Sequence, residues 1–161
     1  MGLTTPSEGD INVEKHKMQF RTELTVETSS GVRLKATPGK TTTVLGSYYP
    51  DTKRILPELG NVHTMYFGPR DGCFNLLNVP DELYRAKGPE GFWEEYNKPW
   101  LDAAIARGDM IVLATEPIGR AIYIYDDNGL ISGLTGYGRE IKYLETHGYV
   151  YDRAAHQMVK K

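Results

Sequence analysis

The segment 89–114 constrains the fold more than any other part of the chain. From Pro89 to Arg107, apolar and aromatic side chains recur every three or four residues, which is the spacing of an amphipathic helix. Pro99 divides this stretch into two helices or bends one, because proline lacks the N–H that continues a helix. Gly108 ends the helical pattern, and the unbroken apolar run Met110–Ala114 predicts a central strand buried on both faces.

The rest of the chain carries further strand and helix patterns. Alternation of apolar and polar residues predicts a hairpin of Met18–Val26 with Val32–Ala36, a strand at Thr42–Leu45, and a last hairpin of Tyr149–Tyr151 with Gln157–Val159. Ala121–Tyr125 predicts one more strand, followed by a turn at Asp126–Gly129. Helical spacing and capping residues predict a short helix within 49–59, a helix start at Asn78–Glu82 and an amphipathic helix at Tyr137–His147.

These patterns predict an α+β fold with an antiparallel or mixed sheet packed against helices. We expect Val44, Leu45, Ile111–Ala114 and Tyr149–Tyr151 to share the sheet, with the Tyr137–His147 helix against it. Residues 1–16 have almost no apolar periodicity and are interpreted as a flexible leader or linker remnant. Residues 17–161 then form one domain.

Composition excludes several classes of protein. The chain has 161 residues, a net charge of −2 and a single cysteine, Cys73, so it offers neither an internal disulfide nor a cysteine-rich zinc site. The four histidines lie outside the spacings of common metal motifs, and we predict no metal and no cofactor. No apolar run is long enough to span a membrane. The net charge argues against a strongly basic nucleic-acid binder.

A local basic segment nevertheless lies between Gly31 and Arg54. It holds five basic residues against the single acid Asp51, and it also contains two tyrosines. Such a patch suits the phosphates of a nucleic acid. The basic residues are Arg33, Lys35, Lys40, Lys53 and Arg54.

Gly39-Lys40-Thr41-Thr42-Thr43 resembles the end of a nucleotide-binding loop. That loop needs a glycine five residues earlier, where this chain has Leu34, so nucleotide hydrolysis is excluded. The ammonium of Lys40 and the three hydroxyls of Thr41, Thr42 and Thr43 remain suitable for holding a phosphodiester. The alternative is a solvated lysine in a turn before a strand.

Thr135-Gly-Tyr-Gly-Arg-Glu140 is the second unusual motif. It places a hydroxyl, a phenol, a guanidinium and a carboxylate at the start of a predicted helix, where anions bind readily. Arg139 and Glu140 are therefore candidates for catalysis, and Thr135 and Tyr137 for substrate binding. The alternative for Glu140 is a residue that merely favours a helix start.

Other polar residues are weaker candidates. His63 follows the predicted short helix in a loop, where it is a candidate general acid or base. Arg70 and Asp71 form either a salt-bridged turn or part of an anion site. His147 suits a helix C-terminus, and the spacing of Trp93, Tyr96 and Trp100 favours the core over a platform for stacked bases.

Several motifs in combination resemble the C-terminal toxin domains of bacterial polymorphic toxins, and the CdiA-type contact-dependent growth inhibition toxins in particular. The resemblance covers roughly residues 36–159. It rests on Gly39–Gly46, Phe74–Asn78, the block from Phe92 to Asp109 and Thr135–Glu140. Toxins of this kind are similar to the compact α+β nucleases of the barnase, EndoU, colicin and RelE group.

The resemblance implies a ribonuclease that cleaves RNA, most often tRNA, without a metal. It implies delivery from the cell surface within a larger toxin, action in the cytoplasm of the target cell, a cognate acidic immunity protein as partner, and elongation factor Tu as a candidate host cofactor. Metal-free cleavage needs a base, an acid and cations around the phosphate. The expected catalytic residues are Lys40, Thr42, His63, Arg139 and Glu140, and the expected RNA-binding residues are Arg33, Lys35, Thr41, Lys53, Arg70, Thr135 and Tyr137.

Two alternatives stay open at the level of the sequence. A toxin delivered in the same way could consume NAD or transfer ADP-ribose, using Tyr, Arg and Glu around a nicotinamide. The other alternative is a nucleic-acid-binding module without catalysis, in which Lys40 and Arg139 serve only affinity.

Overall fold

The computed structural model describes residues 24–27, 33–36, 40–47, 52, 74–77, 79 and 81–161. The strands are β1 (Leu24–Glu27), β2 (Arg33–Ala36), β3 (Thr42–Leu45), β4 (Phe74–Asn75), β5 (Met110–Leu113), β6 (Tyr123–Tyr125), β7 (Ile131–Leu134), β8 (Tyr149–Asp152) and β9 (Gln157–Lys160). The helices are α3 (Asp81–Phe92), the π-helix η2 (Trp93–Asn97), α4 (Lys98–Arg107), the 3₁₀-helix η3 (Gly119–Ala121) and α5 (Gly136–Thr146).

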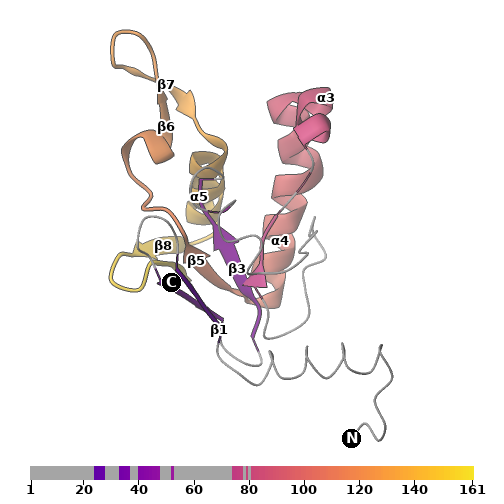
Figure 1. Ribbon diagram of the computed structural model, residues 1–161, viewed down its shortest axis with the longest axis vertical. Coiled ribbons are helices and arrows are strands. Elements are labelled where there is room, and N and C mark those ends of the chain that lie inside the picture. The colour runs from indigo at the N-terminus through magenta and orange to yellow at the C-terminus, as the bar shows by residue number, and fades with distance from the viewer. Residues whose placement is uncertain are drawn as a thin grey trace, which may run out of the picture.

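A five-stranded mixed sheet organises the molecule (Figure 1). Its strand order is β4-β3-β5-β9-β8, with β3 parallel to both β4 and β5, and β9 antiparallel to both β5 and β8. The strand β5 is central and almost wholly buried, as its unbroken apolar sequence predicts. The expected α+β class and the expected sheet are confirmed, and the sheet is the mixed variant.

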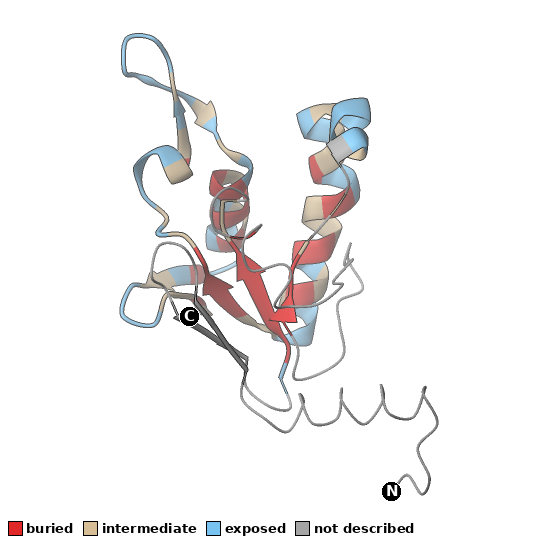
Figure 2. Ribbon diagram, in the orientation of Figure 1, coloured by how far each residue is buried: buried red, intermediate tan, exposed pale blue. Residues whose placement is uncertain are grey.

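Two helical layers pack on the same face of this sheet: the helices that precede β5 form one, and α5 forms the other. Because side chains alternate along a strand, Leu45, Ile111 and Leu113 point to the same face. There they join one apolar cluster with Trp93, Trp100 and Leu101 from the helices before β5, and with Tyr137, Ile141 and Leu144 from α5. Figure 2 shows the buried residues concentrated on the central strands and on the helix sides that face them.

The helices α3, η2 and α4 follow one another without a loop and are called here the helical run. The run bends at Gly88, whose backbone (φ 73°, ψ 171°) is not helical, and Pro89 follows directly. A left-handed φ of this kind favours glycine. α3 begins at Asp81, so the predicted helix start is confirmed. Pro99 lies in the first turn of α4, where proline is tolerated, and the backbone before it at Asn97 and Lys98 is helical. The predicted division near Pro99 is therefore wrong, and the bend lies at Gly88.

The hairpin of β6 and β7 lies outside the main sheet and projects from it (Figure 1). The predicted strand at 121–125 is shorter in the structure, where Ala121 ends η3 and β6 begins at Tyr123; its partner β7 was not predicted. The hairpin is largely exposed, and Leu130 at its tip is 64% exposed.

The remaining hairpins match the sequence patterns. β1 pairs antiparallel with β2, and β8 pairs antiparallel with β9. The predicted leader at 1–16 and most of the predicted helix within 49–59 lie outside the described residues. Of the helices that the structure describes, none combines the length and apolar character needed to cross a membrane.

Candidate functional site

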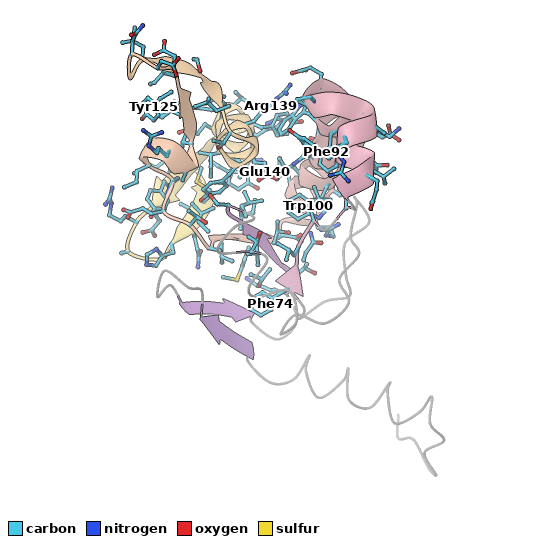
Figure 3. The ribbon with its side chains drawn as sticks, turned by 45° about the horizontal axis from the view of Figure 1, so that its top comes forward. Phe74, Phe92, Trp100, Tyr125, Arg139 and Glu140 are labelled. Atoms are coloured by element: carbon cyan, nitrogen blue, oxygen red, sulfur yellow. The ribbon has the colours of Figure 1, made fainter. Side chains whose placement is uncertain are left out.

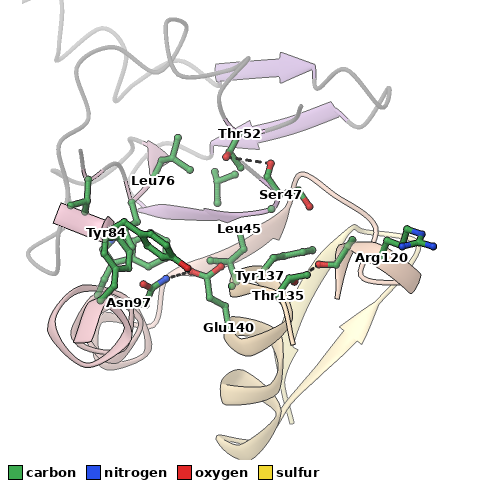
Figure 4. A pocket seen from close by; sticks show the side chains of 18 residues that line it. Leu45, Ser47, Thr52, Leu76, Tyr84, Asn97, Arg120, Thr135, Tyr137 and Glu140 are labelled. Atoms are coloured by element: carbon green, nitrogen blue, oxygen red, sulfur yellow. Dashed lines mark hydrogen bonds between the residues drawn. The ribbon is translucent and has the colours of Figure 1, made fainter. Parts of the chain in front are cut away.

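A pocket of about 430 Å³ opens between the start of α5, the end of β3 and the helical run (Figure 4). This volume lies within the range of about 300–1,000 Å³ that is usual for small-molecule sites. Its lining combines apolar and aromatic side chains with a few polar groups. The lining residues discussed below are Tyr84, Phe92, Asn97, Trp100, Arg120, Thr135, Tyr137 and Glu140.

Glu140 is a buried ionisable residue in the wall of this pocket. The helical repeat of α5 places Tyr137, Ile141 and Leu144 on its inner face, and Glu140 falls on that same face with only 7% of its surface exposed. Burial raises the pKa of the Glu140 carboxyl from its ordinary value of 4.5 to about 8, because the charged form loses its hydration. The Asn97 amide donates a hydrogen bond of 3.1 Å to Glu140 Oε2, which lowers the pKa and offsets part of this rise.

The first turn of α5 is held in place by its cap. Thr135 Oγ1 accepts a hydrogen bond from the Gly138 amide at 2.9 Å and donates to the Ala121 carbonyl oxygen at 2.5 Å. Gly138 packs so closely on the Ile122 carbonyl that a Cβ would lie 2.1 Å from its oxygen. The glycine therefore allows the close approach that brings Glu140 to the pocket.

Tyr137 and Thr135, both predicted to bind RNA, line the pocket but have structural partners. The Tyr137 hydroxyl donates to the Thr115 carbonyl oxygen at 2.5 Å. Thr135 is the helix cap described above. Each side chain thus holds the start of α5 against the chain that leads to it.

Three aromatic side chains form the wall opposite α5. Tyr84 and Phe92 pack edge to face with ring centres 5.0 Å apart, and Trp100 also lines the pocket and is 1% exposed. Trp93, Tyr96 and Trp100 are all buried, so their assignment to the core is confirmed. Tyr84, which was not predicted as a site residue, is 47% exposed and therefore accessible at the rim.

A buried chain of hydrogen bonds supports this wall from beneath. Trp100 Nε1 donates to Asn75 Oδ1 at 3.1 Å, and Asn75 Nδ2 donates to Thr43 Oγ1 at 2.9 Å. Thr43 Oγ1 donates in turn to Asp109 Oδ2 at 2.8 Å, and Arg107 pairs with the same carboxylate. Strands β3 and β4 are thereby fixed to the helical run by polar contacts that the sequence patterns did not predict.

Lys40 and Thr42 do not contribute to the lining of this pocket. Lys40 is exposed before β3, whereas Thr41 and Thr42 are buried. Thr42 Oγ1 is fully buried and makes no hydrogen bond with any described residue. The expected joint cleft of Lys40 and Thr42 with Arg139 and Glu140 is not formed by the described residues.

Arg139 points away from Glu140 (Figure 3). Its guanidinium forms two hydrogen bonds with the Glu90 carboxylate, at 2.7 and 2.9 Å, and lies 4.6 Å from the centre of the Trp93 ring. The hydrogen bonds with Glu90 raise the pKa of Arg139. This contact joins α5 to α3. Among the described residues that line the pocket, the cation is Arg120, which was not predicted and whose guanidinium faces outward from the rim (Figure 4).

The other predicted site residues cannot be placed in the pocket. Arg33 and Lys35 are described only as backbone positions in β2. His63, Lys53, Arg70 and the turn residue Asp71 lie outside the described residues. His147 caps the end of α5, where its ring nitrogen Nδ1 lies 2.9 Å from the Tyr143 carbonyl oxygen.

Within the described part of the chain, no three His, Cys, Asp or Glu side chains lie close enough together to hold a metal ion. The absence of a metal requirement stays a prediction. No family model, curated protein or solved structure matches the chain. Its function therefore has to be inferred from the pocket, and Glu140, with Asn97 beside it, is the group there with the most distinctive chemistry.

Proposed function

We propose that this domain is an antibacterial toxin domain that cleaves RNA, foremost tRNA, by metal-independent acid–base catalysis in which Glu140 is the general acid. The observation that carries the proposal is the buried carboxyl in the pocket wall. With a pKa raised to about 8, Glu140 is mostly protonated at neutral pH and so holds a proton that it can transfer.

The chemistry needs one proton donor and one proton acceptor. The ribose 2′-oxygen attacks the phosphorus and forms a new P–O bond, and its proton passes to a base. The bond from phosphorus to the 5′-oxygen breaks, and Glu140 gives its proton to that oxygen. The products are a 2′,3′-cyclic phosphate and a 5′-hydroxyl, and no oxidant or metal enters the balance.

The rest of the pocket is compatible with a nucleotide. Its volume of about 430 Å³ falls in the range of small-ligand sites. Tyr84 and Phe92 offer aromatic surface on which a nucleobase can stack. Arg120 supplies a cation at the rim, where the phosphate backbone would pass. His63 remains the predicted base.

The biological setting is proposed from the resemblance to the CdiA-type toxins. A ribonuclease of this kind would be delivered within a larger cell-surface protein, and its producer would need an immunity protein that blocks the site. An acidic partner over the basic segment 31–54 is expected, because complementary charge speeds and directs association.

A direct assay separates this proposal from its alternatives. The purified chain is incubated in EDTA with total RNA and, separately, with NAD, and Glu140→Gln is treated in the same way. We expect RNA to be cut, NAD to be unchanged and the variant to be slower by about 10²–10⁴. Consumption of NAD, or no reaction with either substrate, would refute the proposal.

A further inference from the structure

Asn97 is the polar partner of the buried carboxyl, and it occupies an unusual place in the chain. It is the last residue of the π-helix η2, where the Lys98 amide donates to the Trp93 carbonyl five residues earlier. Turns of this type are rare and occur frequently at functional sites. Trp93 and Tyr96 of this turn are buried in the core, and Asn97 lines the pocket.

In the hydrogen bond between Asn97 and Glu140, the Asn97 amide is the donor and the Glu140 carboxyl is the acceptor. The Asn97 nitrogen carries two hydrogens and accepts nothing, so it donates to Glu140 Oε2. When Glu140 is neutral, the oxygen that carries the acid proton is the poorer acceptor, and the proton therefore belongs on the other oxygen, Oε1. We propose that Asn97 is a positioning residue that keeps the transferable proton of Glu140 on Oε1, an inference that rests on the proposed role of Glu140 as general acid.

The bond has a second effect on proton transfer. A donor stabilises the ionised carboxylate more than the neutral acid, so Asn97 limits the rise in the pKa that burial imposes. Without it, Glu140 would be a weaker acid whose proton is divided between two oxygens. Both changes reduce the rate of proton transfer to a leaving oxygen.

The other charged and polar groups described near Glu140 are turned away from it or paired with other residues. On α5, Arg139 is paired with Glu90, and the Tyr137 hydroxyl donates to the Thr115 carbonyl. On the helical run, Glu94 is paired with Lys98, Tyr84 is half-exposed at the rim, and Tyr96 is buried. Arg120 faces outward from the rim (Figure 4). Asn97 is thus the described group that contacts the carboxyl directly.

The test compares Asn97→Leu, which removes the donor, with Asn97→Gln, which retains an amide, and with Asn128→Leu in the exposed hairpin turn as the matched control. The pH dependence of RNA cleavage is measured for each. In Asn97→Leu, the pH above which cleavage falls should rise by about one unit or more, because hydrogen bonds to ionised groups are among the stronger ones. The rate at pH 7 should fall about tenfold, because Glu140 becomes a weaker acid and its proton is no longer kept on Oε1. Asn97→Gln should recover part of both losses, and Asn128→Leu should equal the wild type.

A second measurement does not depend on cleavage. The Glu140 carboxyl is titrated by carbon NMR in the wild type and in Asn97→Leu, with Glu140→Gln used to assign its signal. A higher pKa in Asn97→Leu supports the inference, and identical titrations overturn it whether or not RNA is cut. A wild-type chain that cuts no RNA overturns the proposed function instead. The titration still decides whether the Asn97 amide lowers the pKa of the Glu140 carboxyl.

Discussion

Glu140 makes the stability of the fold depend on pH. Its pKa is about 8 in the folded chain and near its ordinary value of 4.5 when unfolded, so between these values the folded state binds more protons. The free energy of unfolding therefore falls as the pH rises from about 4.5 to about 8 and levels off above.

We expect the Glu140 contribution to this loss to be on the order of 5 kcal/mol, since one pKa unit corresponds to about 1.4 kcal/mol. Urea denaturation at several pH values measures it. Glu140→Gln removes the titrating group and should flatten the pH dependence. An unchanged slope in the variant would mean that Glu140 is not the group responsible.

Gly138 sets how closely α5 approaches Ile122. An alanine there would place its Cβ 2.1 Å from the Ile122 oxygen, so the backbone of α5 or of Ile122 must shift. Gly138→Ala should destabilise the fold by about 1–3 kcal/mol and slow cleavage, because Glu140 moves with the helix.

Gly136→Ala is the matched control for this change. It lies two residues earlier in the same turn, and nothing lies within 4 Å of the added Cβ. Thermal unfolding of both variants makes the comparison. Equal stabilities would show that the contact between α5 and Ile122 is looser than described.

Between elements, Asn75 connects two strands to the helical run. Asn75→Leu would leave the buried Trp100 Nε1 without its acceptor and take a donor from Thr43. We expect a loss of about 2 kcal/mol in urea denaturation, in the range for an unsatisfied buried polar group. Ser132→Ala, which removes an exposed hydrogen bond in the hairpin, should cost much less. A similar cost for both would argue against the buried chain of hydrogen bonds.

The contact of Arg139 with Glu90 makes it possible to distinguish two roles of Arg139. It is either a structural link between α5 and α3 or a cation that stabilises the phosphate during cleavage. If Arg139 only joins α5 to α3, Arg139→Ala and Glu90→Ala should behave alike and retain RNA cleavage, because surface ion pairs contribute little to stability. If Arg139 stabilises the phosphate, its variant alone loses activity. Parallel rate measurements on the two variants decide between them.

Sequence patterns identified most of the described elements and less of their arrangement. The apolar run of β5 and the helical spacing around Tyr137 and Ile141 are local signals, and local periodicity is what such patterns record. The parallel pairing of β3 with β5 and the separation of β6 from the sheet depend on contacts distant in sequence. No short-range signal encodes them.

The same limit applies to the site. Glu140 was a candidate from its motif, but its pairing with Asn97 joins residues 43 positions apart. Arg139, its neighbour, was a candidate for the same reason, yet the helical repeat turns it outward to Glu90. Adjacent residues of a helix differ by about 100° in direction, so a motif read along the chain cannot tell which of them enters a pocket.

At the scale of the whole molecule, the pocket lies where the two helical layers meet on one face of the sheet. α5 supplies the carboxyl, and the helical run supplies both the amide that holds it and the aromatic wall. Neither layer forms the site alone. Correct packing of α5 against the helical run is therefore a condition for the proposed activity, and the variants above that loosen this contact should also slow cleavage.

The proposed mechanism is tested most directly by single-turnover cleavage of RNA in EDTA between pH 5 and pH 9, with the wild type and Glu140→Gln. The wild-type rate should fall above about pH 8, where Glu140 loses its proton. The variant should be folded, slower by about 10²–10⁴ and free of that decline. A folded Glu140→Gln variant that cleaves RNA as fast as the wild type would contradict the mechanism.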